Sequence, residues 1–139
     1  MRAVVAGVAL LLLTGCTTPL TASRLGGSVA ETYAGLYATQ QALLGRTDVQ
    51  RTQLQPVATC RRTGTVADGP GEDWSCTAEV LDGGTPVPQS FEVQLKADGC
   101  WKAEGPPATQ PAQLVDPRTG AGTTNPLAEF DGCVDTSWH

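Results

Sequence analysis

The segment WSCTAEVLDGGTPVPQSFEVQLKADGCWKA, residues 74–103, decides the predicted fold. Apolar and polar residues alternate over 74–81 and again over 90–96, a pattern typical of strands that bury one face. Asp82-Gly83-Gly84 predicts a tight turn between the two strands. The segment therefore predicts neighbouring antiparallel strands with one apolar and one polar face.

A second turn follows directly at Ala97-Asp98-Gly99. A three-residue loop with Gly99 in the left-handed conformation places Leu95 opposite Trp101 across the hairpin. Upstream, residues 57–63 are a further short strand candidate. We therefore expect an antiparallel sheet of three or four strands, with Trp74 and Trp101 in its core.

From residue 105 onward the chain loses any regular pattern, and five prolines interrupt it. These prolines are Pro106, Pro107, Pro111, Pro117 and Pro126. Because proline removes a backbone donor and fixes φ, we predict an irregular tail that straps over the domain. The tail has few apolar anchors, so we expect the helix and sheet to stay folded when residues 105–139 are loosened.

Upstream of the sheet, the sequence predicts one amphipathic helix. Ser28-Val29-Ala30-Glu31 is a capping-box pattern, and Gly45 stands where a C-terminal cap belongs. The residues between them at helical spacing are Val29, Tyr33, Leu36, Tyr37, Gln40, Leu43 and Leu44, with Gln40 as a polar exception. A short second helix is predicted between Thr47 and Pro56. An N-terminal helix packed on an antiparallel sheet gives an α+β fold.

The N-terminus has a positive start, Met1-Arg2, followed by an apolar run over 3–13. This run is shorter than the roughly 20 residues that a spanning helix needs and is typical of a signal peptide. It ends in Leu13-Thr14-Gly15-Cys16, which resembles the lipobox of bacterial lipoproteins. The resemblance implies that residues 1–15 are removed and that Cys16 carries lipid, which anchors the exported chain at the outer face of the cell membrane. Small and polar residues then predict a flexible tether over 16–27, before a single extracytoplasmic domain over 28–139.

The sequence contains 5 Cys. With Cys16 used by lipid, Cys60, Cys76, Cys100 and Cys133 form an even set, and outside the cytoplasm such a set predicts two disulfides with three possible pairings. We favour Cys60–Cys76 and Cys100–Cys133, because the turn at 67–71 folds the first pair together and the second pair staples the tail. Zinc ligand spacing is absent from the sequence, so we predict no metal site.

Composition argues against several functions. A formal net charge of −5 disfavours nucleic acid and also electrostatic docking on anionic lipid, so membrane association depends on covalent lipid. No motif predicts a catalytic residue or a cofactor.

Asp68, Glu72 and Asp73 do not match the spacing of a calcium loop. Arg61 and Arg62 would point to opposite faces of a strand, which disfavours a joint anion site.

The region from Cys60 to Glu104 resembles small uncharacterised lipoproteins of high-GC Gram-positive bacteria. The resembling residues are Gly-Pro-Gly-Glu-Asp-Trp (69–74), Ser75-Cys76 and Asp98-Gly99-Cys100-Trp101. The resemblance implies no assigned activity. We therefore predict a non-enzymatic module that binds an envelope protein, a polymer or a small ligand. Two alternatives stay open: an inhibitor-like domain that blocks a hydrolase through the turn at 67–73, and an enzyme based on carboxylates that meet in the fold.

Overall fold

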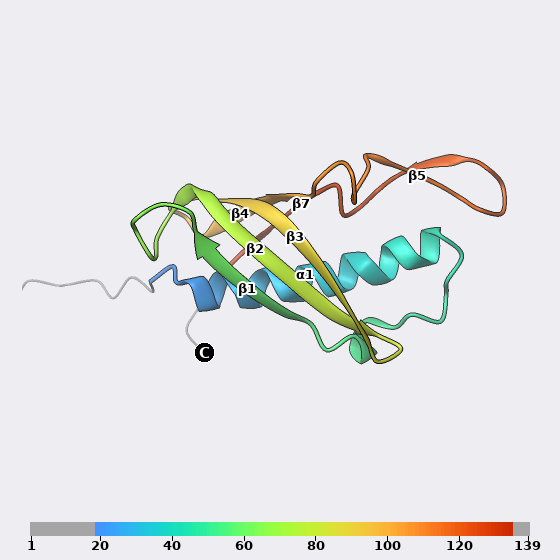
Figure 1. Ribbon diagram of the computed structural model, residues 1–139, viewed down its shortest axis with the longest axis horizontal. Helices are drawn as coiled ribbons and strands as arrows, with labels where there is room; N and C mark the ends of the chain where they lie inside the picture. Colours follow the sequence, from blue (N-terminus) through green and yellow to red (C-terminus); the bar gives the residue numbers. More distant parts are fainter. Residues whose placement is uncertain (1–18, 135–139) are drawn as a thin grey trace, which may run out of the picture.

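The computed structural model describes residues 19–134, which form one helix packed on a five-stranded antiparallel sheet (Figure 1). The predicted α+β class is confirmed. The lipobox with Cys16 and the C-terminal Trp138 lie outside the described residues. The elements are α1 (Ala22–Leu43), a 3-10 turn η1 (Arg51–Gln53), β1 (Val57–Arg62), β2 (Gly71–Asp82), β3 (Thr85–Leu95), β4 (Cys100–Glu104), β5 (Gln113–Val115), β6 (Gly122–Thr124) and β7 (Glu129–Cys133). Within 19–134 no helix has the length and apolar character needed to cross a membrane.

The sheet has the strand order β1-β2-β3-β4-β7, and each neighbouring pair is antiparallel. Its two predicted turns are confirmed. Gly83 and Gly84 join β2 to β3 with φ of 57° and 81°, the left-handed values that a two-residue hairpin requires. Gly99 has φ of 87°, and Leu95 pairs with Trp101 across the β3–β4 hairpin.

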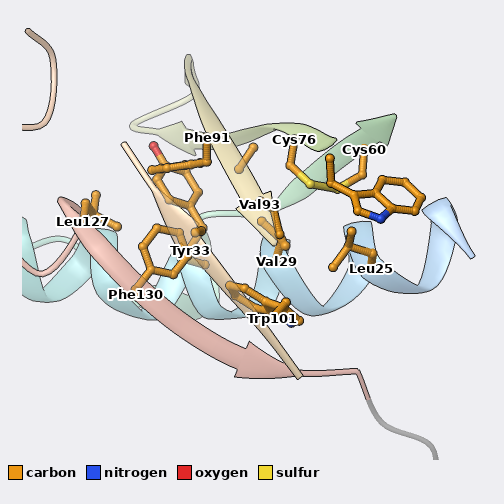
Figure 2. Packing of buried hydrophobic residues seen from close by; sticks show 14 of the residues in the cluster. Leu25, Val29, Tyr33, Cys60, Cys76, Phe91, Val93, Trp101, Leu127 and Phe130 are labelled. Carbon is orange, nitrogen blue, oxygen red and sulfur yellow. A yellow bond between two sulfur atoms is a disulfide. The ribbon is translucent and has the colours of Figure 1, made fainter. Parts of the chain in front are cut away.

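The core lies between α1 and the apolar face of the sheet (Figure 2). Trp74 and Trp101 are both buried, as the alternation predicts. Edge-to-face ring contacts link the helix to the sheet: Tyr33 lies 5.5 Å from Phe91, and Phe91 lies 4.9 Å from Phe130. Trp101 extends this row of rings, with its centroid 5.8 Å from that of Phe130.

The predicted helix start at Ser28 is wrong. Helix α1 begins at Ala22, where the side chain of Thr21 accepts a hydrogen bond from the Arg24 amide. Leu25 is fully buried, so residues 22–27, predicted as part of the tether, belong to the packed domain. Ser28 instead joins the helix to the sheet, because its hydroxyl accepts from the Trp101 indole N–H at 2.8 Å and donates to the Cys133 carbonyl at 3.1 Å.

Two adjacent glycines in α1 have opposite surroundings. A Cβ at Gly26 would lie 2.7 Å from the carbonyl oxygen of Ala58 in β1, whereas a Cβ at Gly27 would meet no atom within 4 Å. Gly26 therefore permits the close approach of α1 to β1. Paired glycines weaken an isolated helix, so local sequence predicts a tether here, whereas packing of α1 on β1 requires a glycine at position 26.

This contrast predicts opposite effects of the same substitution. We expect Gly26→Ala to lower the free energy of unfolding by about 1–3 kcal/mol, because the added methyl group overpacks a rigid backbone contact. Gly27→Ala should raise it by about 0.5–1 kcal/mol, because alanine favours the helix. Urea denaturation of both variants measures the two values, and a loss of stability in Gly27→Ala would contradict the open surroundings of that residue.

The prediction of an irregular tail is also wrong. Residues 129–133 form β7, which pairs with β4, and β5 pairs with β6 in a separate ribbon. Leu127, Phe130 and Val134 are buried in the main core. The prolines fall outside the three strands of the tail, so they limit the length of each strand without preventing pairing.

The end of α1 follows the prediction. Gly45 has φ of 90°, and its amide donates to the Ala42 carbonyl. The next amide, of Arg46, donates to the Gln41 carbonyl at 2.8 Å, which completes a Schellman cap. The short helix expected between Thr47 and Pro56 is present only as the single turn η1.

Candidate functional site

Both disulfides join residues that lie directly opposite each other on neighbouring strands. Cys60 in β1 is bonded to Cys76 in β2, and Cys100 in β4 is bonded to Cys133 in β7. These are the pairs that the sequence favours, and the second one links the tail to the sheet. These bonds use four of the five cysteines in the sequence, and the fifth, Cys16, lies outside the described residues.

Two acidic residues of the turn around 68–73, Asp68 and Asp73, accept hydrogen bonds from groups within the domain. The Asp73 carboxylate accepts from the Arg62 guanidinium at 2.6 Å and from the Gly64 amide, and its pKa lies below the ordinary value chiefly because of Arg62. Asp68 accepts from the amide of Ala22. Among residues 19–134 no three histidine, cysteine or acidic side chains come close enough together to hold a metal ion.

Arg61 and Arg62 also separate as predicted. Arg62 pairs with Asp73 and lies 5.8 Å from the centre of the Trp74 ring. Arg61 is exposed beside Ser75, on the opposite side of the sheet from the helix. The two cations therefore do not form one anion site.

The sheet face opposite α1 is polar, and most of its side chains are exposed. We call it the open face. Its polar residues are Thr59, Arg61, Ser75, Thr77, Glu79, Ser90, Glu92, Gln94, Lys102, Glu104, Glu129 and Asp131. Five carboxylates against two cations make this face acidic.

The open face is most densely charged around Lys102, on β4. The Lys102 ammonium lies 3.0 Å from Glu129 and 3.4 Å from Glu104, and these contacts raise its pKa above the ordinary value, Glu129 more than Glu104. A hollow of about 440 Å³ lies over β4 and β7 and is lined by Lys102, Glu129 and Asp131 among others. A second hollow, of about 450 Å³, lies where the sheet meets the tail. Glu129 lines both hollows, so they adjoin each other along β7.

A second polar cluster fastens the end of α1 to the end of β2. Arg46 donates to both carboxylate oxygens of Asp82, at 2.6 and 2.8 Å, and Tyr37 donates to the same carboxylate at 2.7 Å. These bonds, led by Arg46, lower the pKa of Asp82 to about 2. Burial, followed by the hydrogen bond to Asp82, raises the pKa of Tyr37 to about 12. The mutual pairing of all three groups marks this cluster as structural.

A buried amide cluster joins α1 to the tail and was not predicted. Gln40 Nε2 donates to Gln110 Oε1 and to Asn125 Oδ1, both at 2.9 Å. Asn125 also donates to Gln110 Oε1 and to the Pro111 carbonyl, so its amide is fully engaged. Gln40 as the polar exception on the helix stripe was the signal for this contact, but the patternless tail gave no indication of its partners.

Comparisons with models of protein families, with curated proteins and with solved structures find no match. Of the surfaces described, the open face around Lys102 has the exposure, the charge and the hollows that a binding site requires.

Proposed function

We propose that the chain is an exported lipoprotein, cut before Cys16 and anchored by acyl chains on that cysteine at the outer face of the cell membrane. The observation that carries the proposal is the pairing of the other four cysteines in two disulfides. Two disulfides suit an oxidising compartment, and Cys16 is then the one cysteine of the sequence that remains for lipid attachment. The lipobox resemblance of residues 13–16 supports the same role for Cys16. Two or three acyl chains are sufficient for stable anchoring.

Replacing the anchor residue tests this proposal. We expect Cys16→Ser to abolish incorporation of labelled fatty acid and to move nearly all of the protein out of the membrane fraction, because an acidic domain has no polybasic patch that would hold it there. Thr18→Ser is the matched control and should stay lipidated and membrane-bound. Retention of Cys16→Ser protein in the membrane fraction would contradict the proposal.

The exported domain, in the same proposal, is a non-enzymatic binding module that uses the open face. The Glu104 and Glu129 side chains are 53% and 61% exposed, whereas a carboxylic acid that serves as a general acid needs a buried, desolvating site. An acidic, polar surface with two adjoining hollows favours a partner with cationic groups, such as a basic segment of an envelope protein. The exposure of these carboxylates favours binding over the carboxylate-based enzyme.

Site-specific photo-crosslinking in intact cells tests the open face. A photoreactive amino acid in place of Gln94, which lies beside Lys102 on the open face, is expected to give a discrete adduct of higher mass. The same replacement at Thr39, which is exposed on α1, is the matched control and should give none. Combining the probe with Glu104→Gln and Glu129→Gln should reduce the adduct yield several-fold. Equal adducts at both positions would exclude the open face as the specific site.

The inhibitor-like alternative has less support. It calls for a protruding, rigid turn at 67–73 beside the Cys60–Cys76 disulfide, but residues 71–73 lie within β2. Asp68 and Gly69 are bonded to the chain at Ala22 and Leu20, so the turn is held against the start of the helix. An inhibitory loop of the kind that enters a hydrolase cleft would need to stand clear of its own domain.

A further inference from the structure

The chain is bonded to the folded domain from Pro19, three residues before the start of α1. The Leu20 carbonyl accepts from the Gly69 amide at 2.8 Å, and the Pro19 carbonyl accepts from the Arg24 guanidinium at 3.0 Å. The Ala22 amide donates to the Asp68 carboxylate at 3.1 Å. Pro19 and Leu20 are therefore fixed to both α1 and the β1–β2 loop.

This attachment limits how far the domain can lie from its anchor. Only Thr17 and Thr18 separate Cys16 from Pro19. An extended chain advances about 3.3–3.6 Å per residue, so three steps reach roughly 10 Å. That span is comparable to the polar interfacial layer of a bilayer, about 5–8 Å on each side. Acyl chains on Cys16 would therefore hold the start of α1 at the membrane surface.

The β1–β2 loop lies at this same end of the domain, and the β5–β6 ribbon lies at the opposite end (Figure 1). Residues 63–68 of the loop are all exposed, and 63–67 read Thr-Gly-Thr-Val-Ala, without a charge. Val66 is 58% exposed near the middle of this stretch. The charges that border this stretch are bonded within the domain: Asp73 pairs with Arg62 and accepts from the Gly64 amide, and Asp68 accepts from the Ala22 amide. The uncharged tip can therefore approach lipid without carrying a charged side chain of its own.

We propose that residues 63–67 form a bilayer-contacting tip, which seats the domain with α1 rising from the membrane and the β5–β6 ribbon directed away from it. The contact rests on the proposed lipid anchor at Cys16. It gives the domain a fixed orientation, in which the loop is shielded by lipid and the opposite end of the domain points away from the membrane.

Quenching of tryptophan by brominated lipid tests the orientation. Val66→Trp and Val115→Trp form a matched pair, because these valines are 58% and 62% exposed and lie at opposite ends of the domain. Each full-length lipidated variant is placed in phosphatidylcholine vesicles with and without bromine on the acyl chains. We expect the fluorescence added by Val66→Trp to be quenched strongly, and that added by Val115→Trp to remain at the level of the unsubstituted protein.

Mass analysis of the N-terminal peptide from the same samples separates the possible failures. Acylated Cys16 with no extra quenching in Val66→Trp would overturn the bilayer-contacting tip and leave the anchor intact. Equal quenching in both variants would overturn the fixed orientation. An unacylated Cys16 would overturn both the anchor and the contact that rests on it.

Discussion

Phe130→Ala is expected to lower the free energy of unfolding of the whole domain by about 3–5 kcal/mol, the usual cost of removing a buried aromatic ring. Phe130 is only 6% exposed, and its ring meets Phe91 and Trp101 edge to face. The substitution therefore opens a cavity at the junction of β3, β4 and β7. It also removes two ring contacts, each of which contributes about 0.5–1.5 kcal/mol beyond the burial of area.

Urea denaturation followed by tryptophan fluorescence and by far-ultraviolet circular dichroism measures this loss. The two curves should coincide and shift together, because Phe130 belongs to the same core as the helix. Val115→Ala, in the exposed part of β5, is the control and should change stability by less than about 0.5 kcal/mol. A Phe130→Ala protein that keeps its stability would show that β7 is dispensable for the core.

Removal of the Cys100–Cys133 disulfide is the second large effect. We expect Cys100→Ser combined with Cys133→Ser to lower the free energy of unfolding by about 3–4 kcal/mol, from the loop-closure entropy that the crosslink removes from the unfolded chain. The two residues are 33 apart in sequence, against 16 for Cys60 and Cys76. By the same entropy argument the shorter loop contributes roughly 0.6 kcal/mol less.

Limited proteolysis shows how this loss is distributed. Because β7 contributes Phe130 to the shared core, the double variant should become sensitive throughout the domain at once. A protected fragment spanning residues 28–104 would instead support the separable tail that the sequence predicted. The Cys60→Ala and Cys76→Ala pair, treated in parallel, gives the matched comparison for the loss of one crosslink.

The two expectations share one physical basis. The tail supplies the fifth strand of the sheet, and the helix begins at Ala22, so little of the described chain is an independent appendage. The disulfides reinforce two of the strand pairs in the sheet, which is where a small domain with a modest core gains from crosslinks. For the proposed lipoprotein, these parts would form a rigid base near the anchor and an acidic open face on the sheet.

The sequence by itself determined the parts of the fold that depend on local geometry. Alternation over 74–81 and 90–96 places apolar side chains on one face, whatever packs against it. The left-handed conformations at Gly83, Gly84 and Gly99 follow from turn chemistry, and the alignment of Leu95 with Trp101 follows from the length of the loop. The cap at Gly45 is local in the same sense.

Only the tertiary structure decided what depends on contacts between distant residues. Position 26 requires glycine because the Ala58 carbonyl in β1 lies too close for a Cβ. Ser28 bonds Trp101 and Cys133 instead of capping the helix, so neither residue has the role that its neighbours in sequence suggest. Likewise β7 is a strand because its backbone pairs with the edge of β4 and its side chains complete the core. Its own five residues carry only a weak strand pattern. The open face, too, brings Glu129 of β7 beside Lys102 and Glu104 of β4, although Glu129 lies 27 and 25 residues after them in the sequence. Such pairings arise from the register between strands, which a local pattern does not contain.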